Sequence, residues 1–266
     1  MAAGEVLASV RVAVCESAPE MAAGDASWRA LVAAVRRQRP DIVLLNEMPF
    51  GAWIAAGERA EAAAFAQCRR MHDEGVEHLA ELGAPIVLGT RATIERDRRV
   101  NQGFVWDADR GLLPVHTKQF FPDEPGYFEA RWFDRGETHF RVAHAHGIGF
   151  GFLICTEVWF VEWARRYGRA GAHLIVVPRA TPHPSLDRWL TAIRMAALVS
   201  GCYVASSNRA GTDSRGQEFG GRGWIVDPDG QVLAETSALE PVAAAEVELE
   251  RVARAKREYP RYVRDL

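Results

Sequence analysis

The sequence predicts an α/β protein in which helices cover layers of β-sheet. Apolar runs of strand length alternate with longer segments of helical periodicity, which is typical of layered α/β folds. Of the 266 residues, 48% are hydrophobic and 25% are charged, as in ordinary globular proteins. A chain of this length can bury roughly 75% of its unfolded surface. We therefore expect a single domain over residues 1–266, with a basic C-terminal tail from about residue 250.

The first third of the chain alternates strand and helix patterns in a simple order. The expected elements are a strand at 6–15, an amphipathic helix at 27–39, a buried strand at 41–46, a helix at 58–82 and a strand at 85–90. The helix at 58–82 is favoured by its many Ala and Glu residues. The buried strand is short and follows Pro40. These elements predict one half of the layered structure.

The remainder contains two hairpin patterns separated by further strand and helix units. Residues 103–118 and 221–237 each show two apolar strands joined by an Asp/Gly turn. Between them we expect a strand ending at Cys155, a helix at about 158–169, a strand at 173–178, a helix at 185–200 and a strand at 202–208. Two half-sheets packed together would accommodate this order.

Composition and charge exclude several classes of function. The longest stretch without Asp, Glu, Lys or Arg, residues 142–156, has 15 residues and is too short to span a membrane. The amino terminus lacks a basic leader, and the four cysteines form no CxxC pair, so we expect a cytoplasmic protein with free thiols. A net charge of −3 gives no electrostatic reason to bind nucleic acid or an anionic membrane.

Three residues at the ends of apolar strands carry groups that suit thiol chemistry. Cys155 stands where GFGFLIC meets TEVWFVEWARRYG, and a sulfur near a helix amino terminus is stabilised as a thiolate. Glu47 follows a buried strand in LLNEMPF, and Lys118 ends another in PVHTK. A thiol needs a base or a cation to attack at neutral pH, and these two residues would supply both. The alternatives are core packing for Cys155 and a strand-end salt bridge for the other two.

The sequence resembles the nitrilase superfamily of carbon-nitrogen hydrolases in the segments around Glu47, Lys118 and Cys155 and in the order of these residues along the chain. LLNEMPF is similar to the glutamate motif, HTKQFFPDEPGYFEARWF to the lysine motif, and GFGFLICTEVWFVEWAR followed by GAHLIVVPRAT to the cysteine motif. Later segments, SGCYVASSNRAG and FGGRGWIVDPDGQVLAE, resemble the strands and hairpin that follow the cysteine. The resemblance therefore covers nearly the whole chain.

The resemblance implies a role for each matching residue. Cys155 would be the nucleophile, Glu47 the general base, and Lys118 the cation that stabilises the tetrahedral intermediate, with the Thr156 backbone N–H as a second oxyanion donor. Glu129 matches a second glutamate beside the triad of many amidases. The resemblance also implies a four-layer α-β-β-α sandwich, assembly into homodimers or larger homo-oligomers, and catalysis without a metal or organic cofactor. As an alternative, Glu129 would be a surface carboxylate paired with a neighbouring arginine.

The residues after the cysteine bear on the substrate. Nitrile-cleaving members usually have Trp directly after the cysteine, whereas this chain has Thr156. Members that cleave N-carbamoyl-D-amino acids carry arginines a few residues further on, where this chain has Trp159 and Phe160. We therefore expect a small, uncharged or hydrophobic linear carboxamide that contacts Thr156 and Trp159. Arg179 in VVPRAT offers a carboxylate anchor from another direction, which would favour an N-carbamoyl compound, or else a structural ion pair.

Other features support different classes of function more weakly. His144 and His146 have the spacing of a zinc-binding pair on a strand, the mark of a metallohydrolase, but no HExxH motif accompanies them. The basic tail suggests a nucleic-acid arm, but its interspersed acids favour a solvated face or an arm across a dimer. A non-catalytic module is disfavoured because the triad is complete. The following aromatic residues predict either an oligomer interface or core packing: Trp159, Phe160, Trp163 and Tyr167.

Overall fold

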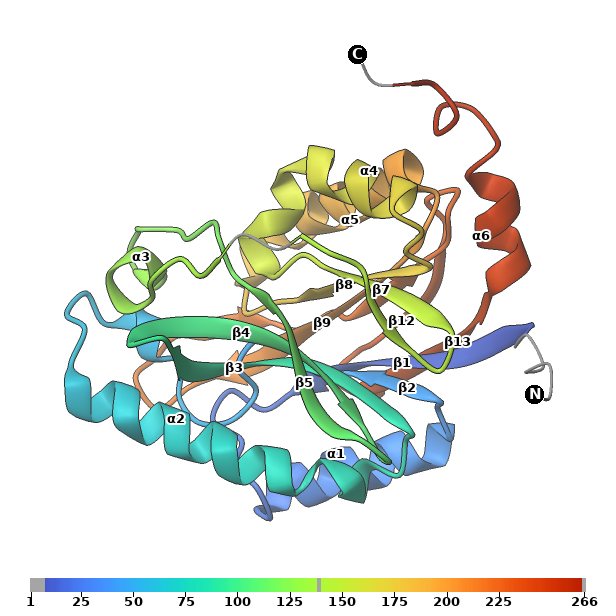
Figure 1. The fold of residues 1–266 in the computed structure, drawn as a ribbon. Helices are drawn as coiled ribbons and strands as arrows, with labels where there is room; N and C mark the ends of the chain where they lie inside the picture. The colour runs from blue at the N-terminus through green and yellow to red at the C-terminus, as the bar shows by residue number, and fades with distance from the viewer. Residues whose placement is uncertain (1–7, 138–139, 265–266) are drawn as a thin grey trace.

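The computed structural model describes residues 8–137 and 140–264, and in it two stacked β-sheets lie between two layers of helices (Figure 1). The main helices are α1 (Ala26–Gln38), α2 (Ala62–Glu77), α4 (Val161–Arg169) and α5 (Leu186–Ser200). The first two cover the outer face of one sheet and the last two cover the outer face of the other. The expected four-layer sandwich is confirmed.

The first sheet has six strands in the order β13-β1-β2-β3-β4-β5. Their bounds are β1 (Ser9–Ser17), β2 (Ile42–Leu44), β3 (Ile86–Glu95), β4 (Arg98–Asp107), β5 (Gly111–Thr117) and β13 (Val242–Glu248). β1, β2 and β3 are parallel, and β4 turns back between β3 and β5. The helix α1 forms because Asp25 caps its first turn by accepting from the backbone N–H of Trp28, and because Trp28 and Leu31 are buried against the sheet.

The second sheet is built around three parallel strands. Its members are β6 (Ala143–Ala145), β7 (Ile148–Phe152), β8 (Leu174–Pro178), β9 (Tyr203–Thr212), β11 (Trp224–Val226) and β12 (Val232–Glu235), with β10 (Glu218–Gly220) pairing the end of β9. The two sheets meet where the end of β1 pairs in parallel with β9, at Glu16 and Asn208. The hairpin expected at 221–237 is confirmed as β11 and β12.

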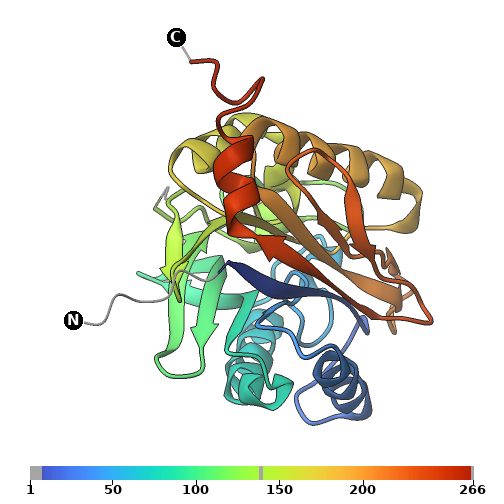
Figure 2. The same cartoon turned by 90° about the vertical axis from the view of Figure 1, so that its right-hand side faces the viewer.

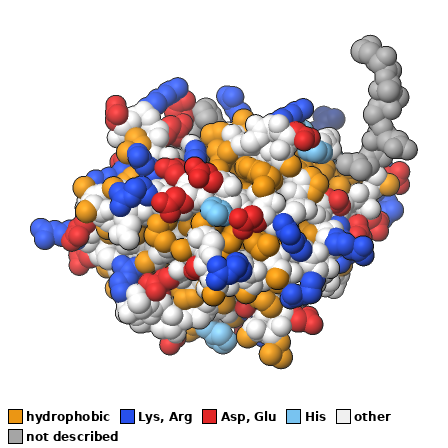
Figure 3. All heavy atoms as spheres, turned by 90° about the horizontal axis from the view of Figure 1, so that it is seen from below, with side chains coloured by type: hydrophobic (Ala, Val, Ile, Leu, Met, Phe, Trp, Pro, Cys, Tyr) orange, Lys and Arg blue, Asp and Glu red, His pale blue; other side chains and the backbone are white. Residues whose placement is uncertain are grey.

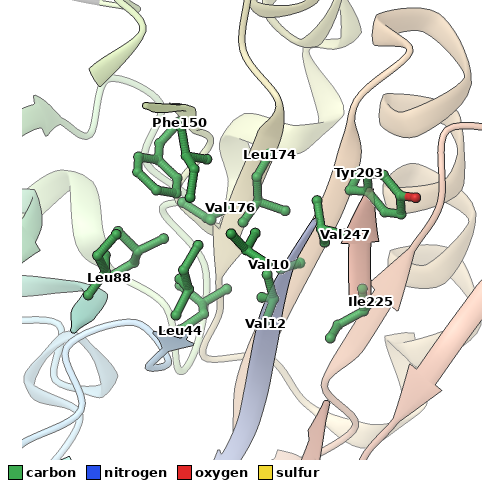
Figure 4. Packing of buried hydrophobic residues seen from close by; sticks show 14 of the residues in the cluster. Val10, Val12, Leu44, Leu88, Phe150, Leu174, Val176, Tyr203, Ile225 and Val247 are labelled. Atoms are coloured by element: carbon green, nitrogen blue, oxygen red, sulfur yellow. The ribbon is translucent and has the colours of Figure 1, made fainter. Parts of the chain in front are cut away.

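The core between the sheets is made of aliphatic and aromatic side chains from both inner faces (Figure 4). Leu44 and Leu88 of the first sheet face Phe150 and Val176 of the second, and all four are 1% exposed or less. On the outer side, α4 and α5 cross closely because Gly168 has no side chain and lies against the Ser200 backbone. Burial of such surface stabilises the fold by about 25 cal/mol per Å².

The end of the chain forms elements that the sequence pattern does not indicate. β13 pairs antiparallel with β1 over seven residue pairs, from Ser9 with Glu248 to Cys15 with Val242, and α6 (Leu249–Ala255) follows it (Figure 2). Part of the basic tail bonds to the rest of the chain, whereas Arg254, Arg257 and Arg264 are exposed. Arg251 pairs with Asp227 and Asp229, and Arg261 donates to the Leu198 carbonyl and to Asp229.

Several short elements complete the description. They are η1 (Ile54–Ala56), η2 (Leu79–Leu82), α3 (Glu129–Trp132), η3 (Cys155–Trp159) and η4 (His183–Ser185). The expected helix at 58–82 is thus divided into α2 and η2. The expected strand at 6–15 is observed from Ser9, and its first two residues lie outside the described residues.

The surface carries charges of both signs. On the face formed by α1 and α2, Arg, Asp and Glu side chains are scattered among apolar ones (Figure 3). Within the described ranges, no helix has both the length and the apolarity that a bilayer crossing requires.

The topology brings one set of strand ends together. β2, β5, β7 and β8 all run in the same direction, so the segments after them lie at one edge of the two sheets. Glu47, Lys118, Cys155 and Arg179 each follow one of these strands within three residues. The same edge of an α/β structure is where ligand sites usually form.

Candidate active site

Lys118 lies buried between two carboxylates at this edge. Its Nζ is 2.7 Å from Glu47 Oε1 and 2.6 Å from Glu129 Oε2, and none of the three side chains is more than 1% exposed. The structure therefore brings together three of the four residues predicted to be catalytic. Glu129 is not the surface partner of an arginine, because its carboxylate is fully enclosed.

The two oxygens of Glu47 have different surroundings. Oε1 accepts hydrogen bonds from Lys118 Nζ and from Asn101 Nδ2, the latter at 2.8 Å. Oε2 is buried and, among the described atoms, has no hydrogen-bond partner. Most buried polar atoms are hydrogen-bonded, so an oxygen without a partner is unusual. Because Oε2 has none, it is free to accept a proton from a bound group. Met48, the next residue, has φ of +43°, an unusual conformation of the kind that clusters at functional sites.

Cys155 lies in the sharp turn after β7 and is the first residue of η3. Its φ is +50°, a left-handed conformation that is strained for a residue with a Cβ. The sulfur was expected near a helix amino terminus, and Cys155 is the first residue of the short 3₁₀ helix η3. The regular helix α4 begins at Val161. Burial and then the Glu47 carboxylate raise the pKa of the thiol, whereas Lys118 lowers it.

The charges of the cluster depend on one another. Burial alone would lower the pKa of Lys118, but Glu129 and Glu47 raise it above its ordinary value, so the ammonium form is stable. Burial raises the pKa of Glu129 to about 8, against the opposing effect of Lys118. Of the two carboxyl groups that share Lys118, Glu129 therefore retains its proton to a higher pH than an ordinary carboxyl does.

Glu157 joins the segment of Cys155 to the segment of Lys118, and sequence reasoning missed it. One of its oxygens accepts from the backbone N–H of Ile154 at 2.8 Å and lies 2.8 Å from His116 Nε2. The other accepts from the backbone N–H of Gln119 at 2.7 Å. A glutamate two residues after the cysteine, in a segment that is otherwise apolar, is the signal that would have identified it.

Arg209 holds the segment that follows Glu47. Its guanidinium donates to the backbone carbonyls of Met48, Gly51 and Pro19, with the Gly51 contact at 2.9 Å. Burial lowers the pKa of Arg209 to about 10. The backbone N–H of Met48 is also bound by Thr90 Oγ1 at 2.8 Å. These bonds fix the strained turn beside the Glu47 carboxylate.

A cavity of about 250 Å³ opens onto the thiol. It is bordered by Glu129, Cys155 and the predicted substrate contacts Thr156 and Trp159. Further lining residues that the sequence analysis did not identify are Pro122, Glu124, Tyr127, Ala180, Thr181, Pro182, Ser185 and Trp189. At roughly 30 Å³ per water molecule, the space suits a small substrate.

Arg179 supports the wall of this cavity and is not among the residues that line it. Its guanidinium donates to Ser206 Oγ and to Thr181 Oγ1, each at 2.7 Å, and to the backbone carbonyl of Arg222. It also lies 4.5 Å from the ring centre of Trp224. The side chain is completely buried, so the structure does not place it where the predicted carboxylate anchor would stand.

The aromatic residues after the cysteine divide between the cavity and the core. Trp159 borders the cavity, and its ring centre is 5.1 Å from that of Trp189. Phe160 stacks on Phe120, while Tyr167 is fully buried and donates to the Phe152 carbonyl. Trp163 stacks on Phe140 at 3.8 Å. These residues therefore do not form one exposed aromatic face.

The predicted histidine pair lies at the opposite end of the sheets from the cavity. His146 Nε2 is 3.1 Å from Asp107 Oδ2, and Asp107 pairs with Ile86 at the start of β3. Asp109 lies close enough to complete a group of three ligand atoms, whereas His144 is not part of it. Exposed acidic groups of this kind are common without an ion, and the cluster is remote from the thiol.

A family profile, sequence relatives and solved structures all relate this chain to carbon-nitrogen hydrolases. The profile of the carbon-nitrogen hydrolase family matches residues 8–257. The chain is similar to the 2-oxoglutaramate amidase of Bacillus subtilis (33% identity over 181 residues, 67% of each chain) and to the N-carbamoylputrescine amidase of Solanum lycopersicum (27% over 240 residues, 84% of this chain and 80% of that one). In fold it resembles the carbon-nitrogen hydrolase from Helicobacter pylori G27, with a TM-score of 0.84, 21% identity and coverage of 96% of this chain and 94% of that one.

The raised pKa of Glu129 predicts how the thiol responds to pH. As Glu129 ionises near pH 8, its negative charge opposes formation of the thiolate. Glu129→Gln removes that charge, so Cys155 should react with iodoacetamide faster than in the wild type above about pH 8, with the difference growing as pH rises. Cys155→Ala gives the background from the other three cysteines, all of which are buried. Equal rates in both proteins throughout the range from about pH 7 to pH 9 would contradict this coupling.

The contacts of Glu157 predict a structural and a kinetic effect of removing its charge. Glu157→Gln replaces an acceptor oxygen by an NH₂ group that faces N–H donors, so the free energy of unfolding should fall by about 2–3 kcal/mol in urea denaturation. The reactivity of Cys155 with iodoacetamide should fall as well, because its turn is no longer held. Glu162→Gln, on the exposed side of α4, is the matched control and should change neither quantity. A wild-type stability for Glu157→Gln would refute the assigned role.

Proposed function

The chain belongs to the carbon-nitrogen hydrolase family, and from this we propose that it hydrolyses small carboxamides through a thioester formed on Cys155. It is a hydrolase of amide C–N bonds, as its relatives are. The proposed catalytic residues are Glu47, Lys118, Cys155 and Glu129. The proposal needs no metal or organic cofactor, since the four side chains supply a nucleophile, a base and a cation.

The observation that carries this proposal is the free oxygen of Glu47. Oε1 is held by Lys118 and Asn101, which fixes the carboxylate, while Oε2 is buried without a partner. A thiol whose pKa is raised by burial is protonated at neutral pH, so it needs a base that can take its proton as it attacks. The unpartnered oxygen of Glu47 has this capacity.

The proposed reaction has two stages. Cys155 Sγ attacks the amide carbon while its proton passes to Glu47, and the oxyanion is stabilised by the Lys118 ammonium and the Thr156 backbone N–H. The C–N bond then breaks, and Glu47 gives its proton to the leaving ammonia or amine. Next, water loses a proton to Glu47 and attacks the thioester. Collapse of the second intermediate breaks the C–S bond, releases the carboxylic acid and returns the proton to the thiol.

The substrate class follows from the residues beside the thiol. We propose a small linear carboxamide, because Thr156 and Trp159 at the cavity offer no fixed positive charge. An N-carbamoyl compound is the second candidate and is supported by the likeness to an N-carbamoylputrescine amidase. The burial of Arg179 removes the anchor on which a carboxylate-bearing N-carbamoyl substrate would depend.

We further propose that the protein is cytoplasmic and forms a homodimer or a larger homo-oligomer. Four buried free cysteines suit a reducing compartment. Apolar side chains are exposed on the outer surface near α4 and α5, namely Trp159, Val161 and Met195. A second copy packed on this surface would bury them.

Turnover of amides by Cys155 is directly testable. The purified protein should release ammonia from short aliphatic carboxamides, and Cys155→Ala should lower kcat by at least about 10³-fold with an unchanged circular dichroism spectrum. Cys202→Ala, which also removes a buried thiol, is the control and should retain activity. Near-normal kcat in Cys155→Ala would overturn the assignment. A kcat/KM for nitriles equal to or above that for the matching amides would overturn the substrate class.

The proposed assembly predicts a mass above that of the monomer. Light scattering at micromolar protein concentration should give at least twice the chain mass, and Val161→Glu with Met195→Glu should shift the population toward monomer because both side chains are exposed. Leu113→Glu, at a more exposed apolar residue on β5, should leave the mass unchanged. A monomeric wild-type protein would contradict the proposed assembly.

A further inference from the structure

The charges around the cavity bear on the far end of the substrate, the part away from the amide that reacts. Of the described residues that line the cavity, two are acidic, Glu124 and Glu129, and Glu129 retains its proton to a higher pH than an ordinary carboxyl does. Neither Lys nor Arg is among them. Lys118 is not among the lining residues either, and its ammonium group pairs with both Glu47 and Glu129. The cavity therefore presents a surface that repels anions and attracts cations.

Glu124 is held in place by its own loop. Its backbone N–H and carbonyl pair with those of Tyr127, at 3.4 and 2.8 Å, and Gly126 between them has φ of +85°, which suits the tight turn. Trp53 Nε1 donates to the Gly126 carbonyl at 3.1 Å, and Gln217 Nε2 donates to the Tyr127 hydroxyl at 3.1 Å. Hydrogen bonds therefore hold the turn that contains Glu124, and the Glu124 side chain is exposed at the edge of the cavity.

Aromatic rings also line the cavity. Tyr127, Trp159 and Trp189 all line it, and the rings of Trp159 and Trp189 are inclined at 57° with their centres 5.1 Å apart. The faces of Trp and Tyr rings carry negative electrostatic potential and attract ammonium groups. Aromatic rings and a carboxylate that line the same cavity are a combination that favours an organic cation over a neutral chain of the same length.

We propose that Glu124, with Tyr127, Trp159 and Trp189, binds a positively charged group at the far end of the substrate, so that the enzyme prefers amides that carry an alkylammonium tail. This inference rests on the proposed amide hydrolysis and narrows its substrate class. Glu124 is a specificity residue here. It takes no part in bond breaking, so its effect falls mainly on KM.

The test compares three amides of similar length whose far ends differ in charge: 4-aminobutanamide, pentanamide and the anion of glutaric acid monoamide. The wild-type protein should show kcat/KM about fivefold higher for 4-aminobutanamide than for pentanamide, and lowest for the anion. Glu124→Gln should bring the first two within about twofold by raising KM for the cation alone. The preference should also shrink as salt is raised, because the ion pair at the rim is screened.

Asp123→Asn is the matched control. Asp123 is adjacent to Glu124 in sequence and also acidic, but it bonds to Arg131 at 2.7 Å and does not line the cavity. This variant should keep the wild-type preference. If Asp123→Asn reduces the preference as much as Glu124→Gln does, a general surface charge and not a local contact is responsible, and the proposed site is wrong.

Binding can be measured without turnover. Butylammonium should slow the alkylation of Cys155 by iodoacetamide more than 1-butanol does, and Glu124→Gln should remove the difference. Hydrolysis of pentanamide with no preference for the cation, together with equal protection by both compounds, would overturn this inference and leave the proposed function standing. Release of ammonia from none of the amides would contradict the proposed function itself.

Discussion

The burial of one ammonium group between two carboxylates is the constraint on which the rest of the site depends. Removing a cation such as Lys118 from water costs several kcal/mol, and only close opposite charges offset that penalty. Glu47 and Glu129 supply them at 2.7 and 2.6 Å. Burial, against the opposing effect of Lys118 and with a further contribution from the Glu47 charge, raises the pKa of Glu129 to about 8. The cluster therefore combines a fixed positive charge, a proton acceptor and a carboxyl group that ionises near pH 8.

Buried polar side chains, more than the apolar core, give this cluster its geometry. The core between the sheets sets where the strands end, but the segments beyond those ends are irregular and must be held individually. Asn101 orients Glu47, Arg209 holds the turn after it, and Glu157 ties the cysteine segment to the lysine segment. Arg179 does the same for the wall of the cavity. Each of these groups is expensive to leave unpaired, so the network favours one arrangement of the loops.

Local pattern was sufficient to predict the alternation of strands and helices and the strand ends beside Glu47 and Lys118, whereas the four-layer arrangement and the place of Glu129 followed from the family resemblance. Apolar runs closed by Glu47 and Lys118 marked strand ends, and parallel strands bring such ends together. The supporting residues were not predictable in this way, since Glu157 and Arg209 bind partners far away in the chain. Arg179 turns inward because Ser206 and Trp224, from other strands, receive it. Residues 242–248, VAAAEVE, are rich in helix-forming Ala and Glu and become a strand only because β1 is available to pair with them.

The pairing of β13 with β1 has a consequence for how the protein is made. β1 leaves the ribosome before the other described strands, whereas its antiparallel neighbour β13 leaves after them. During synthesis, the backbone N–H and C=O groups along one side of β1 have no partner from this chain until residues 242–248 emerge. An unpaired strand edge can pair with other chains, so nascent or prematurely terminated forms would be prone to aggregation. The first sheet is thus completed only after all the other described strands have been translated.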